Sequence, residues 1–278
     1  MSGPFIHALA LGLDPAWRRL PDAERRSSGA AFAAALDAVP SVRTITYSLI
    51  GLQPGIDLML WRLATSVDEL EESAAAALRT GLGRWLTVRE SFLGHIGSSQ
   101  YVAKASSQEQ SLFEGERSRY LVVYPFTKST EWYLLPREVR QGVMNGHMRI
   151  GHAYPQIRQL LAYSFGLDDQ DFLVAYETDD LALFGDLVRE LRGNESRRST
   201  VSDTPILAAI HRPIGRILEL LGAGIETSGP VMDTAADERG RGREGPDPEA
   251  DDRGRGREGP DLDARPTEPG PATVGATR

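Results

Sequence analysis

The chain has 278 residues, of which 41% are hydrophobic and 25% charged, so it can form one large or two small globular domains. Its formal net charge is −8 at pH 7 and its acidic residues are scattered, whereas a nucleic-acid-binding protein needs a clustered basic surface. The chain has no cysteine, which excludes disulfides, thiolate nucleophiles, iron–sulfur clusters and cysteine-ligated zinc.

The amino-terminal run MSGPFIHALALGLDPAWRR is a poor signal peptide. No basic residue precedes its short apolar part, and Asp14 and Pro15 interrupt it. No stretch of the chain approaches the ~20 apolar residues of a membrane span. Because the lack of cysteine also fits the cytosol, we expect a cytoplasmic protein without a membrane span.

The first structural signals are two strands and a helix. Residues 41–49 (SVRTITYSL) alternate and are rich in β-branched side chains, which predicts a strand, and residues 56–63 (IDLMLWRL) predict a second strand after a turn. Ser66 is a suitable helix cap and Glu69 follows three residues later. The alanine-rich segment 66–80 is therefore predicted to be a helix.

The second half of the chain repeats this mixture of strands and helices. Its sequence predicts a strand, a helix, a segment that fits strand or helix, a strand, a helix and a strand. These are residues 120–126, 136–153, 158–163, 171–177, 180–192 and 204–210. The order predicts an α+β fold of two tandem ferredoxin-like units, residues 1–115 and 116–227, each with helices on one face of an antiparallel sheet.

The last part of the chain, residues 228–278, has no apolar pattern. Residues 237–250 (DERGRGREGPDPEA) are repeated almost unchanged at 251–264 (DDRGRGREGPDLDA). Such a segment buries too little apolar surface to offset its conformational entropy, so we predict a disordered tail. RGRG segments can bind RNA, but acidic residues dilute the arginines here, which favours a solvated tail.

The long helix of the second half carries the histidine of greatest interest. Val139, Val143 and Ile150 follow helical spacing, and His147 falls on the same stripe. A histidine that faces the interior is more commonly a hydrogen-bonded core residue, but it can be a ligand or a catalyst. His152 lies five residues further on and off that stripe, so the two do not form the i, i+4 pair of a zinc site.

Aromatic and basic residues cluster just before this helix. Tyr124 and Lys128 lie at a strand end, in YPFTK. A buried tyrosine beside a redox centre can form a radical and a lysine can attract a carboxylate, but an ordinary strand end looks the same. Trp132 and Tyr133 fit the wall of a flat aromatic pocket or a core. No GxGxxG, GxxxxGK[ST] or GxSxG motif supports a nucleotide site or a serine hydrolase.

Several blocks of the sequence together resemble the chlorite dismutase family of haem proteins, which includes the coproheme decarboxylases. The blocks are YSLIGLQPGIDLMLWRLA (47–64), GLGRWL (81–86), YLVVYPFTKSTEWYLLP (120–136), HMRIGHAYPQIRQLLAYSFGLDDQDFLVAYETDDL (147–181) and DTPILAAIH (203–211). The resemblance implies a duplicated ferredoxin-like fold of the dimeric α+β barrel type and a homo-oligomer, commonly a pentamer. It also implies that haem b or iron coproporphyrin III (coproheme) binds to the second half.

The resemblance also carries roles over to individual residues. His147 matches the iron ligand, and Lys128 matches the lysine near the porphyrin propionates. Three further roles follow: pocket-lining aromatics (Trp132 and Tyr133), a carboxylate that hydrogen-bonds the ligand histidine (Glu195), and a propionate contact (Arg198).

The residue on the other side of the iron decides the reaction that the resemblance implies. Chlorite-degrading members have an arginine there, which here matches Gln159, and a neutral amide does not replace a guanidinium. Arg158 is adjacent, but on a strand it would point to the opposite face. Non-actinobacterial coproheme decarboxylases also have glutamine at this position, and their reactive tyrosine matches Tyr124.

The implied reaction is therefore the peroxide-dependent decarboxylation of coproheme to haem b. In it, a Tyr124 radical takes a hydrogen atom from a propionate, and loss of carbon dioxide leaves a vinyl group. Hydrogen peroxide and the porphyrin are the implied partners. The alternatives are chlorite dismutation or haem peroxidase activity, and haem binding or sensing without turnover. The last is favoured by Gln110 and Ser111, which stand where the decarboxylases have an arginine.

Overall fold

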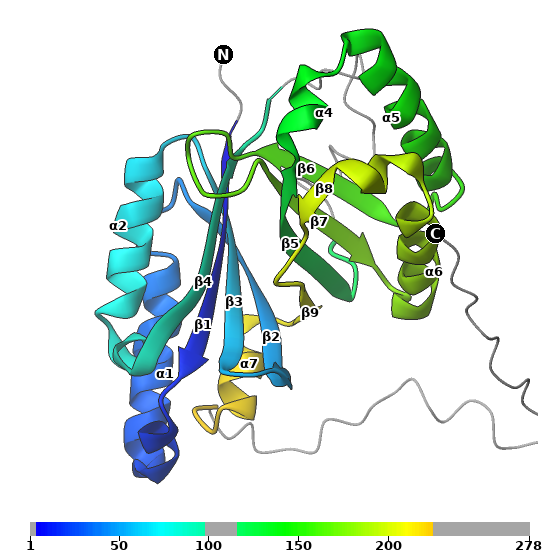
Figure 1. Cartoon of the computed structure of the whole chain (residues 1–278). Helices are drawn as coiled ribbons and strands as arrows, with labels where there is room; N and C mark the ends of the chain where they lie inside the picture. The colour runs from blue at the N-terminus through cyan, green and yellow to red at the C-terminus, as the bar shows by residue number, and fades with distance from the viewer. Residues whose placement is uncertain (1–3, 98–115, 225–278) are drawn as a thin grey trace, which may run out of the picture. The chain divides into compact units, whose positions relative to one another are not determined.

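The structure is a computed structural model whose described residues are 4–97 and 116–224 (Figure 1). They belong to a unit that extends from Met1 to Thr227. Residues 228–278, predicted to be disordered, form a second unit outside the described residues, and Gln110 and Ser111 also lie outside them. Within the described part of the chain, no helix is long and apolar enough to cross a membrane.

The described elements alternate between strands and helices. In the first half they are β1 (Phe5–Leu13), η1 (Pro15–Arg19), α1 (Asp22–Leu36), β2 (Arg43–Gln53), β3 (Ile56–Ala64), α2 (Val67–Leu78), η2 (Gly81–Trp85) and β4 (Leu86–His95), where η marks a 3-10 helix. In the second half they are β5 (Tyr120–Lys128), α4 (Thr130–Leu134), α5 (Arg137–His152), β6 (Arg158–Tyr163), β7 (Phe172–Thr178), α6 (Leu181–Arg192), η3 (Glu195–Ser199), β8 (Thr200–Ser202), β9 (Leu207–His211) and α7 (Ile214–Leu220).

The strands and helices predicted from the sequence are confirmed, and the segment left open between strand and helix is strand β6. Ser66 caps α2 as expected, because its side chain accepts a hydrogen bond from the backbone N–H of Asp68. Glu69 does not complete the capping box and instead accepts a hydrogen bond from Thr65. Elements β1, α1, β4 and α7 are not predicted from the sequence.

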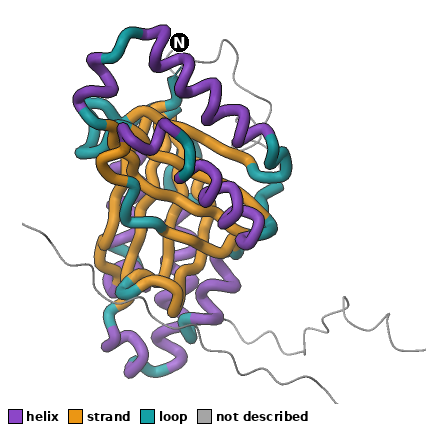
Figure 2. Tube along the Cα trace, turned by 45° about the vertical axis from the view of Figure 1, so that its right-hand side comes forward, coloured by secondary structure: helices purple, strands orange, loops and turns teal. Residues whose placement is uncertain are grey.

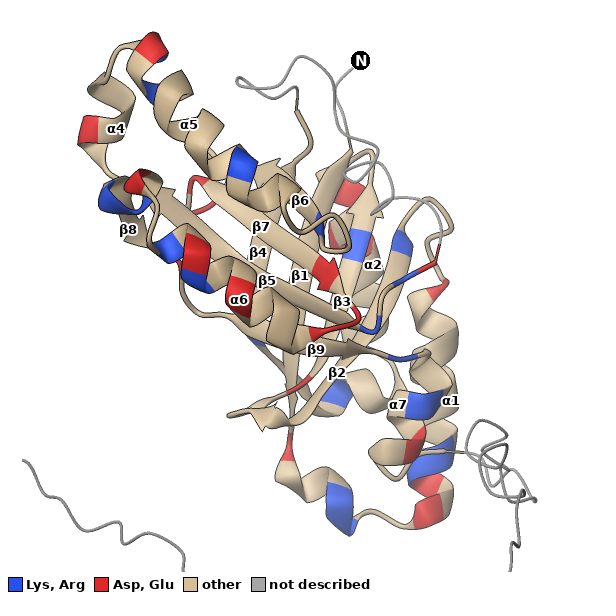
Figure 3. Ribbon diagram, turned by 90° about the vertical axis from the view of Figure 1, so that its right-hand side faces the viewer, with Lys and Arg blue, Asp and Glu red and all other residues tan. Residues whose placement is uncertain are grey.

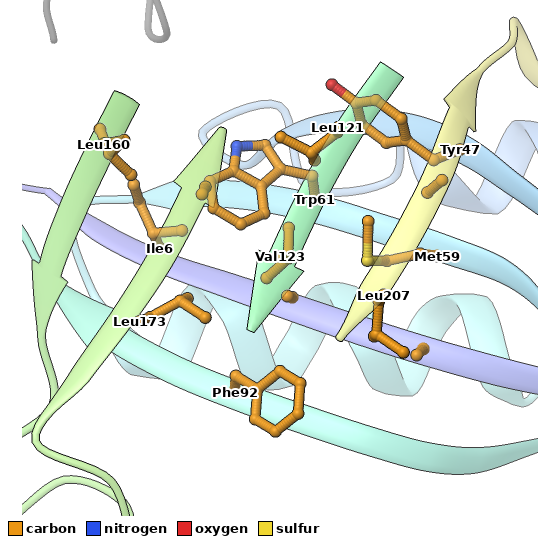
Figure 4. Close-up of a cluster of buried hydrophobic side chains, with 14 of the residues drawn as sticks. Ile6, Tyr47, Met59, Trp61, Phe92, Leu121, Val123, Leu160, Leu173 and Leu207 are labelled. Carbon is orange, nitrogen blue, oxygen red and sulfur yellow. The ribbon is translucent and has the colours of Figure 1, made fainter. Parts of the chain in front are cut away.

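The strands form a nine-stranded antiparallel sheet in the order β7-β6-β4-β1-β3-β2-β9-β5-β8. Because β7 also pairs with β5, the sheet curls back on itself and closes into a barrel-like structure (Figure 1). Side chains from both halves of the chain fill the interior (Figure 4). The members labelled in Figure 4 are Ile6, Tyr47, Met59, Trp61, Phe92, Leu121, Val123, Leu160, Leu173 and Leu207.

Strand β1 shows why a central strand is hard to recognise in the sequence. It lies between β3 and β4 and is buried on both faces. Ile6 and Ala8 face the barrel interior, whereas Leu9 and Leu11 pack on the other side in a cluster that includes residues of α1, α2 and α7. A strand covered on both faces has no alternation of apolar and polar residues, which is the usual signal.

The closure between β4 and β6 depends on side chains, because a single residue pair, His95 with Tyr163, joins these strands. The Ser164 hydroxyl donates to the carbonyl oxygen of Leu93 at 2.7 Å, and Asp168 Oδ2 accepts from the backbone N–H of Leu93 at 3.0 Å. The Gln170 amide donates to the same Asp168 oxygen at 2.9 Å. These side chains satisfy backbone groups that a longer strand pairing would satisfy.

Gly94 lies at this closure, and we expect Gly94→Ala to destabilise the protein. A Cβ added to Gly94 would lie 2.7 Å from Ala162 Cβ, inside the packed barrel. Overpacking of this kind costs about 1–3 kcal/mol, which a lower urea midpoint would report. Gly185→Ala is the matched control, because nothing lies within 4 Å of an added Cβ on that helical glycine. An unchanged midpoint for Gly94→Ala would contradict the tight closure.

Helices cover the outside of the strands (Figure 2). On the second half, α6 and part of α5 cover the outer face of β5, β7 and β6. The apolar side chains on this face are called the outer cluster. Its buried members are Val122, Ile157, Val174, Tyr176 and Leu187, and its partly buried members are Tyr124, Phe126, Ile150, Tyr154, Leu161, Phe172, Leu183, Phe184, Leu191 and Ala208.

Candidate functional site

Helix α5 has an apolar stripe, yet none of its 16 residues is fully buried. It packs mainly against η3 and α6, and Ile150 reaches the outer cluster, whereas Val139 is exposed. Amphipathic helices normally bury their apolar stripe against the core. The incomplete burial of this stripe indicates that α5 and the outer face together are suited to enclosing a further apolar group.

His147 lies on the half-buried side of α5. Its Nδ1 lies 3.3 Å from Ser196 Oγ, in a hydrogen bond that holds the ring. Burial, together with the nearby positive charge of Lys128, lowers the pKa of His147 to about 4, so the ring is neutral at pH 7. Because Ser196 contacts Nδ1, Nε2 is the nitrogen left to bind a metal, and a neutral imidazole is the form that does so.

The structure places Ser196, rather than Glu195, beside His147. Glu195 begins η3 and is exposed, whereas Ser196 is buried. The Asn194 side chain caps η3 by accepting from the backbone N–H of Ser196 at 3.0 Å. In a 3-10 helix, neighbouring residues point in very different directions, so the choice between them depends on this local geometry.

Lys128 contacts Ser196, the same residue that contacts His147. Its Nζ donates to the carbonyl oxygen of Ser196 at 2.9 Å and lies 4.6 Å from the centre of the Trp132 ring. Burial, with the nearby charge of Arg197, lowers the pKa of Lys128 to about 8. Lys128 therefore keeps its charge at pH 7 and loses it in moderately alkaline solution.

The two adjacent aromatic residues do not form one wall. Trp132 is only 3% exposed and packs against Lys128, whereas Tyr133 is 37% exposed. The Tyr133 hydroxyl donates to Asp171 Oδ2 at 2.7 Å, and the same oxygen accepts the backbone N–H of Lys128 at 2.7 Å. The structure thus brings Trp132 together with Lys128 and ties Tyr133 to the start of β7.

Tyr124 and Gln159 lie on the same outer face of the barrel. Tyr124 belongs to the outer cluster, where its ring stacks on that of Tyr176, and burial beside this second phenol raises the pKa of Tyr124 well above the ordinary value. Gln159 is paired across the strands with Tyr176. Arg158 faces the other side of the wall, where it lies 2.6 Å from Glu177 Oε2, as strand alternation predicts.

Two arginines lie beside Tyr124, and Arg198 is not one of them. A cavity of about 60 Å³ is lined by Tyr124, Arg192 and Arg197, whereas Arg198 is exposed. Both cavity arginines face Asp203, at 3.8 Å for Arg192 and 2.5 Å for Arg197. Basic and acidic positions alternate along α6 and the segment before β8 (Figure 3). The cations near the site are therefore Lys128, Arg192 and Arg197.

The donor set at this site fits a porphyrin metal better than a bare ion. Within residues 4–97 and 116–224, no three His, Asp or Glu side chains gather as metal ligands. One neutral imidazole next to an apolar face and flanking cations is the arrangement that a metalloporphyrin with acidic side chains needs. His147, the outer cluster and the three cations provide it.

Known proteins similar to this chain identify its family. The family model described as chlorite dismutase matches residues 18–212. The coproheme decarboxylase of Mycolicibacterium smegmatis is 32% identical over 165 residues, which cover 57% of this chain and 68% of that protein. The chlorite dismutase of Candidatus Nitrospira defluvii in complex with imidazole has a TM-score of 0.73 and 29% identity, covering 80% of this chain and 96% of that one. A mutant of that enzyme has a TM-score of 0.73 and 30% identity, covering 80% and 97%. The chain therefore belongs to the chlorite dismutase family.

Proposed function

We propose that this protein is a haem-dependent enzyme that uses peroxide to decarboxylate coproheme to haem b. The observation that carries the proposal is a set of residues around one face of the sheet: the neutral His147, Lys128 and Tyr124. On this face, strand β6 presents the neutral amide of Gln159. The neighbouring guanidinium, Arg158, is held on the opposite side by Glu177. The named M. smegmatis relative is a coproheme decarboxylase.

The chain's own residues fit this cofactor and substrate. His147 supplies the metal ligand, and Ser196 fixes its ring through Nδ1. The outer cluster supplies apolar contacts for the porphyrin faces. Lys128 and Arg197 supply positive charge for the porphyrin carboxylates, in place of the exposed Arg198.

The reaction divides between the bound iron and the protein. The iron, with peroxide, supplies the oxidising chemistry. For each propionate, peroxide is the two-electron oxidant and is reduced to water. Tyr124, which its raised pKa keeps protonated, gives up its phenolic hydrogen atom and takes one from the propionate, and the second electron is removed as the carboxylate leaves as carbon dioxide and the vinyl group forms. Lys128 holds that carboxylate through its ammonium group. Gln159 offers an amide donor without the positive charge that would retain a chlorite anion.

The order of elements supports a finer description of the fold. The sequence β-α-β-β-α-β occurs once from β1 to β4 and again from β5 to β9, where α4 and β8 are additions. This recurrence supports two ferredoxin-like units, residues 1–115 and 116–227, that form a barrel of the dimeric α+β type. We propose a homo-oligomer of such chains, a pentamer by family resemblance, and light scattering of the purified protein measures the number of subunits.

Reconstitution with iron coproporphyrin III tests the proposed function. Peroxide is added in steps, and mass spectrometry of the porphyrin is expected to show the successive loss of two carboxyl groups as carbon dioxide. An oxygen electrode with chlorite is expected to show no oxygen release. Tight coproheme binding with an unchanged porphyrin mass would overturn the proposed decarboxylase activity and favour a haem-binding protein without turnover. Oxygen release from chlorite would favour chlorite dismutation.

Coproheme affinity is expected to fall as the pH rises through about 8. Below its lowered pKa Lys128 is charged and attracts a carboxylate, and above it the charge is lost. Loss of one charge-assisted hydrogen bond weakens binding by about tenfold. Dissociation constants at pH 7 and pH 9.5 measure the change, and Lys128→Gln should remove most of it. Arg216→Gln, which removes an exposed cation on α7, should leave it in place.

A further inference from the structure

Asp203 faces both arginines at the small cavity beside Tyr124. Its Oδ2 atom lies 2.5 Å from Nη1 of Arg197 and 3.8 Å from Nη2 of Arg192. The three residues come from different elements, because Arg192 ends α6, Arg197 lies in η3 and Asp203 follows β8. One carboxylate therefore holds two guanidinium groups at the same cavity wall.

This cavity lies between Tyr124 and the residue that holds the candidate metal ligand. Tyr124 lines one part of it, and Ser196, whose hydroxyl contacts His147, lines another. The cavity volume of about 60 Å³ is well below the roughly 300 Å³ at which ligand pockets begin. It cannot receive a porphyrin edge unless the side chains that line it move.

The arginines are the more mobile partners of this ion-pair group. The side chain of Asp203 is 17% exposed, whereas those of Arg197 and Arg192 are 38% and 54% exposed. Ion pairs that reach water in this way contribute little to stability, so another carboxylate can replace Asp203 beside an arginine. A carboxylate that enters the cavity therefore meets a like charge on Asp203 and an opposite charge on Arg197.

We propose that Asp203 is a specificity-determining residue that competes with a substrate carboxylate for Arg197. It occupies an N–H donor of the guanidinium and repels a second carboxylate, so it weakens the binding of a propionate beside Tyr124. When that propionate leaves as carbon dioxide, the guanidinium keeps Asp203 as a partner beside the neutral vinyl group. Asp203 thus reduces the difference in affinity between substrate and product. This inference rests on the proposed function, in which Arg197 attracts porphyrin carboxylates.

Asp203→Asn tests the competition, because it keeps the shape of the side chain and removes its charge. The probe is iron-free coproporphyrin III, which needs no metal ligand and whose fluorescence measures the affinity. Asp203→Asn is expected to bind it about tenfold more tightly than the unmodified protein. Asp186→Asn is the matched control, since it removes the same charge from a pair with Arg189 at 2.9 Å on α6, and it should leave the affinity unchanged. The tetramethyl ester of coproporphyrin III, which has no carboxylate, should bind all three proteins alike.

A double-mutant cycle separates competition from a purely structural role. Arg197→Gln should bind coproporphyrin III more weakly, and adding Asp203→Asn should then have little effect, because the guanidinium for which the two carboxylates compete is gone. An affinity of Asp203→Asn for coproporphyrin III equal to or below that of Asp186→Asn would overturn the competition, as would a full gain that persists beside Arg197→Gln. An unmodified protein that binds coproheme but never decarboxylates it would overturn the proposed function instead, whatever the affinities of the variants.

Discussion

The His147→Ala protein is expected to lose its affinity for haem b and coproheme by more than about a hundredfold, because it lacks the metal ligand. The ring is neutral at pH 7, and Ser196 holds it through Nδ1, so it is prepared to bind a metal through Nε2. Absorption spectra recorded during titration with each porphyrin measure the loss as a missing Soret band of the histidine-ligated form.

The control for this substitution is His152→Ala, on the same helix. His152 is exposed at the end of α5, so its removal should leave the spectrum and affinity unchanged. Free imidazole added to the His147→Ala protein should restore part of the ligated spectrum, because it fills the space that the substitution leaves. A histidine-ligated spectrum in His147→Ala without imidazole would place the ligand elsewhere in the chain.

The second large effect is expected for Tyr124→Phe, which should lower the rate of carbon dioxide release by about a thousandfold. The substitution removes the only atom of Tyr124 that can lose a hydrogen atom and keeps the ring in the outer cluster. The affinity for coproheme should therefore stay within a few-fold of the original, as about the same apolar surface is buried. Single-turnover measurements of porphyrin mass separate the two quantities.

Tyr120→Phe provides the comparison, because Tyr120 begins the same strand and lies beneath the guanidinium of Arg119. It should retain full activity. Retention of full activity by Tyr124→Phe would instead remove the tyrosine from the reaction and leave the haem-binding site without its proposed chemistry.

The elements that could be predicted from the sequence are those with a local signal. Helix α2 has a capping serine, and β2 alternates visibly. Helix α1 has no such signal, because its buried side includes Gly29, where the helix passes close to Ala223, and therefore lacks a full stripe of large apolar residues. Strand β4 also lacks a clear apolar pattern, because most of its residues are exposed or half-buried.

The sequence pattern offers His147, Tyr124 and Lys128 of the candidate site only as candidates, and their expected roles come from the family resemblance. Ser196 and Asp171 have no such signal, because each makes its contact with a residue far away in the sequence. No local pattern marks such a pairing, since it arises only when the sheet closes.

The wall between the barrel interior and the outer face has one further consequence. Side chains alternate along a strand, so a shift of β6 by one residue would exchange Arg158 and Gln159. Glu177, only 1% exposed inside the barrel, lies 2.6 Å from Arg158 and 3.4 Å from Arg117. Breaking a buried ion pair by removing one partner is strongly destabilising, which secures the register. A buried anion on one side of the sheet thus determines that the other side presents the amide of Gln159 and not the guanidinium of Arg158.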